Sequence, residues 1–103
     1  MKQKTAYIVG PYRADTIRGI TENIRKAESV ALKYWAKGYA VICPHKNTAL
    51  LDGALPDDVW LKGDITLMLL CDVVVVCGDW GASAGSINEI KAAKAAGMEI
   101  IYG

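Results

Sequence analysis

Apolar and polar positions alternate in blocks along the chain, and the blocks predict four strands. Residues 73–76 are four consecutive valines without polar alternation. A run of this kind predicts a strand covered on both faces, as in a parallel α/β sheet. The other apolar runs predict strands at Thr5–Val9, Tyr39–Cys43 and Glu99–Tyr102.

Helical spacing of apolar residues predicts three helices between these strands. We expect them from Asp15 or Thr16 to Lys37, from Pro56 to Leu70, and from Ser86 to Ala96. Gly38 and Gly97 are placed to end the first and the third. The segment Pro44–Leu55 lacks periodicity and contains polar and turn-forming residues, including Asp52, so it is predicted to be a surface loop.

The order of these elements predicts the fold. Strands that alternate with helices form right-handed crossovers and a parallel sheet. We expect one domain over residues 1–103, a Rossmann- or flavodoxin-like three-layer sandwich of class α/β with strand order 2-1-3-4. Ligands of such sheets bind beyond the carboxyl ends of the strands. We therefore expect the site at the ends of strands one and three.

The composition of the chain limits the classes of binding partner. The net charge is +1 and basic residues are not clustered, which disfavours a nucleic-acid polymer or a membrane surface as partner. No apolar run approaches the roughly 20 residues needed to cross a bilayer. The first residues turn polar too soon for a signal peptide, so a cytoplasmic location is expected.

Metals and familiar cofactors are not expected. The chain has a single histidine, and its three cysteines form no CxxC pair, so we expect reduced core thiols and no metal site. The first strand runs into Gly10-Pro11-Tyr12-Arg13, which matches neither the dinucleotide-binding nor the P-loop motif.

Polar and charged residues that could take part in chemistry instead follow the ends of the predicted strands. Glu89 follows the third strand and a turn rich in Gly and Ser, near the start of a helix, where an anion is favoured. A carboxylate there is a poor phosphate ligand but suits a developing positive charge; alternatively it only complements the helix dipole. Asp64, inside the second helix, either joins this site or faces solvent.

Several of these segments resemble one superfamily. They are YIVGPYR, the helix-borne Asp64, CDVVVV, and S-x-G-x-x-x-E-I-x-x-A-x-x-x-G from Ser83 to Gly97. Together they resemble the nucleoside 2-deoxyribosyltransferases, whose superfamily includes the 2'-deoxynucleoside 5'-phosphate N-hydrolases. GPYRA, PHKNT and GDW-x-x-S are more closely similar to a group of small bacterial and phage proteins within it, a domain of unknown function.

The resemblance implies roles for individual residues. Glu89 would be the nucleophile at the anomeric carbon of a 2-deoxyribose, with Tyr7 beside it. Asp64 would contact the sugar or protonate the leaving base. Arg13 and Ser83 match the hydrolases' contacts to the 5'-phosphate, near Gly10 and the backbone of Gly85 and Ser86. His45 would stack on the base, contact phosphate or simply hold its turn. Arg13 could also merely balance Asp15.

Three functions follow as alternatives. The first is hydrolysis of the N-glycosidic bond of a deoxynucleoside 5'-monophosphate, without a cofactor. The second is base exchange on free deoxynucleosides, and the third is a non-catalytic nucleotide-binding or regulatory module. A homodimer or higher oligomer is expected, because the domain is small and rich in tryptophan. The helix Pro56–Leu70 is the predicted interface.

Overall fold

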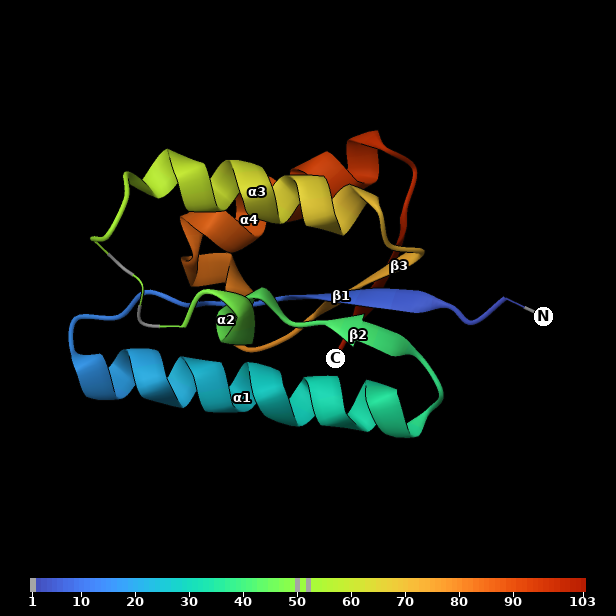
Figure 1. The fold of residues 1–103 in the computed structure, drawn as a ribbon, viewed down its shortest axis with the longest axis horizontal. Coiled ribbons are helices and arrows are strands. Elements are labelled where there is room, and N and C mark those ends of the chain that lie inside the picture. The colour runs from blue at the N-terminus through green and yellow to red at the C-terminus, as the bar shows by residue number, and fades with distance from the viewer. Residues whose placement is uncertain (1, 50, 52) are drawn as a thin grey trace.

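The computed structural model describes residues 2–49, 51 and 53–103. Its centre is a four-stranded parallel sheet of order β2-β1-β3-β4 (Figure 1). The strands are β1 (Thr5–Val9), β2 (Ala40–Ile42), β3 (Val73–Val76) and β4 (Glu99–Tyr102). The predicted strands, their parallel direction and their order are confirmed. The parts of the predicted loop at Leu50 and Asp52 lie outside the described residues.

Helices cover both faces of this sheet. The helices are α1 (Ile17–Ala36), α2 (Pro44–Asn47), α3 (Asp57–Leu69) and α4 (Ala84–Ala95), with a short 3-10 turn at Trp80–Ala82. Helix α1 lies on one face, and α3 and α4 lie on the other (Figure 1). Thr16 caps α1, since its side chain accepts a hydrogen bond from the Gly19 amide at 3.0 Å. The fold is therefore the expected three-layer sandwich.

Two predicted boundaries need correction. The predicted loop Pro44–Leu55 begins with helix α2, where Pro44 takes a first-turn position and the Cys43 carbonyl accepts from the Lys46 amide at 3.0 Å. A single turn is too short to show a helical period in the sequence. Helix α4 begins at Ala84 rather than Ser86, because Ser83 is its cap.

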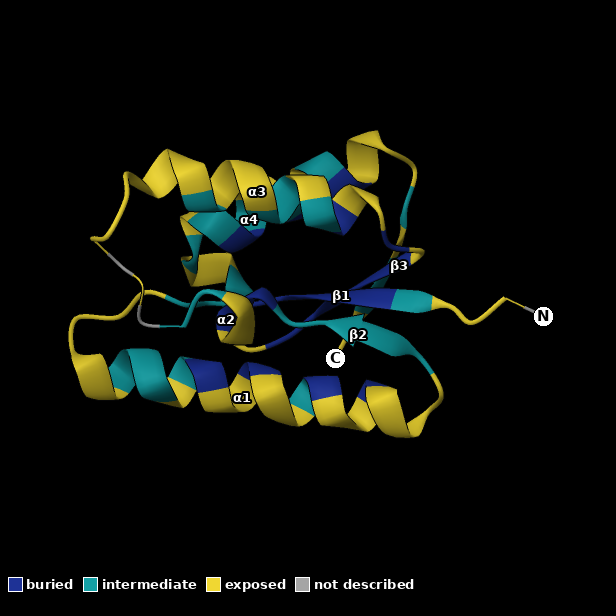
Figure 2. Ribbon diagram, in the orientation of Figure 1, coloured by how far each residue is buried: buried dark blue, intermediate teal, exposed yellow. Residues whose placement is uncertain are grey.

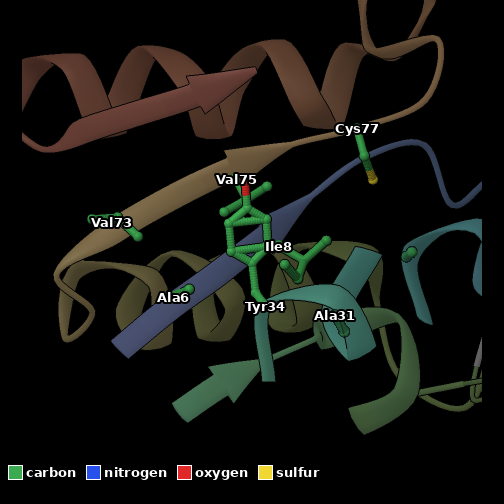
Figure 3. Close-up of a cluster of buried hydrophobic side chains, with 8 residues drawn as sticks. Ala6, Ile8, Ala31, Tyr34, Val73, Val75 and Cys77 are labelled. Carbon is green, nitrogen blue, oxygen red and sulfur yellow. The ribbon is translucent and has the colours of Figure 1, made fainter. Parts of the chain in front are cut away.

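The central strands β1 and β3 are buried on both faces (Figure 2). One core packs against α1, and Figure 3 shows Ala6, Ile8, Val73 and Val75 meeting Ala31 and Tyr34 there. Alternate residues of the same strands form the second core, against α3 and α4: Tyr7, Val9, Val74 and Val76 with Met68, Ile90 and Ala93. Tyr7 thus points from the middle of the sheet toward α4.

Helix α3 exposes several large apolar side chains to solvent. Val59, Leu61 and Leu69 are exposed, and so is Leu70 just after it. This agrees with a sequence that is apolar on most faces of the helix. The homo-oligomer interface expected on it stays a prediction.

The residues that directly follow β1 and β3, Gly10 and Cys77, approach each other closely, and this gives a first testable prediction. A Cβ added at Gly10 would lie 2.8 Å from the Cys77 Sγ and 3.1 Å from the Cys77 carbonyl oxygen. Gly10→Ala should therefore lower the free energy of unfolding by about 1–3 kcal/mol, the usual result of overpacking. Urea denaturation measures it.

The matched control is Gly63→Ala in α3, where a Cβ would meet nothing within 4 Å. That change should leave the free energy of unfolding unchanged or raise it, since alanine favours the helix. A Gly10→Ala protein as stable as the parent would show that the Cys77 side chain and the strand ends yield without strain.

Candidate active site

A cavity of about 650 Å³ opens at the carboxyl ends of β1 and β3, the edge predicted for the site. It is bounded by the segment after β1, by α2, by α3 and by the start of α4. Of the predicted site residues, these line it: Gly10, Arg13, His45, Asp64, Ser83, Gly85, Ser86 and Glu89. Tyr7 lies beneath it in the core and reaches it through Glu89. The structure thus brings the predicted residues together, while their roles remain predictions.

Tyr7 and Glu89 form the best-defined contact of the site. The Tyr7 hydroxyl donates a hydrogen bond to Glu89 Oε2 at 2.7 Å. Burial, with the nearby charges of Glu89 and Asp64, raises the pKa of Tyr7 far above its usual value, so it stays a donor. Burial also raises the pKa of Glu89 to about 7, although the bond from Tyr7 lowers it. Glu89 is therefore a carboxyl that changes charge near neutral pH.

This contact bears on the alternative reading of Glu89 as a helix-dipole partner. Ser83 caps α4, so Glu89 lies in the second turn of the helix. The dipole effect fades within the first turn. Glu89 is also half-buried and directed to Tyr7. This placement differs from that of a group which only complements the helix dipole.

Asp64 is the second acid of the cavity. It is half-buried on α3 rather than fully solvated, and burial raises its pKa to about 6. Its negative charge in turn raises the pKa of Glu89. Two acids with raised pKa values on one cavity are typical of acid–base or nucleophilic chemistry.

Arg13 lies at the cavity in an ion pair that the sequence did not indicate. Its Nη2 is 2.6 Å from Asp57 Oδ2, and both side chains are largely exposed. Arg13 thus pairs with Asp57 at the start of α3 rather than with the neighbouring Asp15 that the sequence suggested. The Asn23 side-chain amide donates to the Arg13 carbonyl at 3.3 Å and to that of Tyr12 at 3.1 Å, which ties this segment to α1.

The start of α4 presents polar groups from the opposite wall. Ser83 Oγ accepts from the Ser86 amide at 3.2 Å, which leaves its own O–H able to donate. A Cβ at Gly85 would meet nothing within 4 Å, so the backbone there is open to a ligand. Ser86 is buried, and its hydroxyl has no hydrogen-bond partner among the described residues.

His45 holds the segment after β1. Its Nε2 lies 3.0 Å from the Gly10 carbonyl oxygen and 3.1 Å from that of Pro11. Both partners only accept, so Nε2 carries the proton. Burial lowers the pKa of His45, which keeps the ring neutral. Of the three roles considered from the sequence, this geometry favours holding the turn over binding phosphate by charge.

Sequence reasoning missed Trp60 and Asn23, which also line the cavity. For Trp60 a signal existed: Asp57, Trp60 and Asp64 fall three and four residues apart, which places them on one face of a helix. Within the described part of the chain, no three His, Cys, Asp or Glu side chains are grouped as metal ligands would be. Nor does that part contain a helix able to cross a membrane.

Comparisons with known proteins give a shared fold and a family. No curated protein matches the chain in sequence. The structure is similar to that of a 2-deoxyribosyltransferase from Bacillus psychrosaccharolyticus, with a TM-score of 0.67 and 19% identity over 95% of this chain and 70% of that one. This likeness shows a shared fold. Residues 4–103 match a family described as Domain of unknown function (DUF7768), and the chain belongs to that family.

Proposed function

We propose that the protein cleaves the N-glycosidic bond of a deoxynucleoside 5'-monophosphate through a covalent intermediate on Glu89. The observation that carries this is a half-buried carboxyl, held at 2.7 Å by Tyr7, at a cavity that a second acid also lines. The structural neighbour is named a 2-deoxyribosyltransferase, which supports deoxyribosyl chemistry on this fold.

The proposed reaction has two steps. A Glu89 carboxylate oxygen bonds to the anomeric carbon while the carbon–nitrogen bond breaks, and the departing base takes a proton from Asp64. Water then attacks the same carbon, gives its proton to Asp64, and releases Glu89 and the sugar phosphate. The carboxylate stabilises the positive charge that develops on the sugar, as in retaining glycosidases.

Phosphate recognition would use groups on both sides of the cavity. Arg13 offers a fork of donors, and Ser83 with the first amides of α4 faces it. The Arg13–Asp57 pair is exposed, and exposed pairs contribute little stability, so a phosphate can take the place of Asp57.

Base exchange on free deoxynucleosides is the second candidate. Among the described residues, four acidic side chains line the cavity, Asp57, Asp64, Asp79 and Glu89, against the two basic side chains of Arg13 and Lys26. This balance favours an uncharged ligand over an anion. Incubation with deoxynucleotides and deoxynucleosides, followed by chromatography of the free base, tests both: exchange requires an added second base, and hydrolysis does not. A non-catalytic module would release no base.

Arg13→Ala gives the test of phosphate recognition. A deoxynucleoside 5'-monophosphate should bind far better than its nucleoside, and the substitution should erase most of that difference. The expected loss is about 1.5–3 kcal/mol of binding free energy, the usual contribution of a charge-assisted hydrogen bond. Calorimetric titration measures it, and added salt should weaken only the monophosphate.

The matched control is Arg18→Ala. Arg18 is an exposed arginine of α1 that pairs with Glu22 at 3.3 Å and does not line the cavity. It should leave both affinities unchanged. Equal affinity of the parent protein for nucleoside and monophosphate would instead favour base exchange.

A further inference from the structure

Trp60 projects from α3 to the cavity without joining the core. It lies one turn before Asp64 on the same side of the helix, and both residues line the cavity. Neither of the two hydrophobic cores described above includes it. Trp80, by contrast, packs against the second core. An indole that lines a cavity and is left out of the cores has its ring available to a ligand.

The indole nitrogen gives a second, independent indication. Nε1 of Trp60 is buried and has no hydrogen-bond partner among the described residues. A buried tryptophan N–H usually finds an acceptor, because leaving it unpaired is unfavourable. In the described part of the chain, Ser86 Oγ and His45 Nδ1 are likewise buried without a partner, and both residues line the same cavity. A ligand in the cavity would supply the missing partner.

We propose that Trp60 forms the nucleobase subsite, with its ring against the base and its Nε1–H donating to a carbonyl oxygen or ring nitrogen of the base. The proposal rests on the proposed function, in which Asp64 protonates the leaving base and the base therefore lies near α3. Aromatic side chains stack on every base. A phosphate is the weaker match, because Asp57 and Asp64 lie on the same face of the helix.

Binding measurements can distinguish the contribution of the Trp60 ring to nucleotide affinity from that of its Nε1–H. In a Glu89→Gln background, which prevents turnover, calorimetry would compare Trp60→Phe and Trp60→Ala. The probes are deoxyadenosine and thymidine 5'-monophosphates and the baseless 2-deoxyribose 5-phosphate. Trp60→Phe should weaken the better-bound nucleotide about threefold to tenfold through loss of one hydrogen bond. Trp60→Ala should weaken it more than tenfold through loss of stacking as well. Affinity for the baseless sugar should not change.

Trp35→Phe is the control, since Trp35 is an exposed residue of α1 outside the cavity. Parent-like nucleotide affinity in both Trp60 variants would overturn the proposal. So would an equal loss for the baseless sugar, or failure of the Glu89→Gln protein to bind either nucleotide. The base-release assay keeps the two proposals apart. If base is released and the Trp60 variants bind normally, only the subsite is wrong. If no base is released and they bind weakly, only the glycosidase function is wrong.

Discussion

Glu89→Ala should abolish release of free base from a deoxynucleotide. Without the carboxylate, no group in the proposed mechanism can form the bond to the anomeric carbon or offset the charge developing on the sugar. The Tyr7 hydroxyl would also lose its partner at 2.7 Å. Chromatographic detection of the free base over time measures the result. Glu22→Ala, at an exposed residue of α1, should release base at the parent rate.

Glu89→Gln separates loss of chemistry from loss of structure. The amide oxygen can still accept from Tyr7, so folding and most ligand binding should persist while base release is lost. In the parent, burial raises the Glu89 pKa from an ordinary 4.5 to about 7. Its contribution to stability is therefore full at low pH and declines as the pH rises from about 4.5 to about 7. An uncharged glutamine lacks this decline.

Above pH 7 the Glu89→Gln protein should thus unfold at a higher temperature than the parent. A variant that is inactive yet more stable would show that the buried acid is kept for function. Base release by Glu89→Ala at the parent rate would show that the nucleophile is another group.

The fold was predictable because its central signals are local. The unbroken valines of β3 predict a strand with two covered faces, and the intervening helices leave parallel crossovers as the connection. The loop prediction missed helix α2, and this error has a physical cause as well. The single turn that begins at Pro44 is held by backbone hydrogen bonds that the Cys43 carbonyl accepts, and it has no period to detect.

The site was predictable only in part, because contacts depend on packing between distant segments. Glu89 stood out by following a buried strand and a small polar turn. Its bond to Tyr7 joins residues 82 positions apart and depends on how α4 packs over β1, so only the family resemblance suggested it. The Arg13–Asp57 pair and the unpartnered Trp60 nitrogen depend likewise on where the start of α3 lies.

Asp64→Asn should lower the rate of base release by about 10²–10⁴, the usual loss on removing a general acid. It should also change the pH profile. Glu89 must be ionised to attack, so activity should fall as the pH drops below its pKa of about 7. Asp64 must carry a proton to donate, so activity should also fall as the pH rises above about 6. Because the two acids interact, they titrate as a pair, and the parent profile should be a narrow bell between those values.

Asp64→Asn should remove the high-pH side of this bell-shaped activity profile. The asparagine side chain cannot lose a proton, so the fall in activity at high pH should disappear. In the active form Asp64 is protonated and uncharged, as asparagine is, so the fall at low pH that reports ionisation of Glu89 should remain. Initial rates of base release across the pH range measure the loss of the high-pH fall and the survival of the low-pH one. The control is Asp58→Asn, an exposed aspartate of the same helix that does not line the cavity, which should keep the parent profile. An Asp64→Asn protein with the parent rate and bell would mean that the base departs without a proton from Asp64.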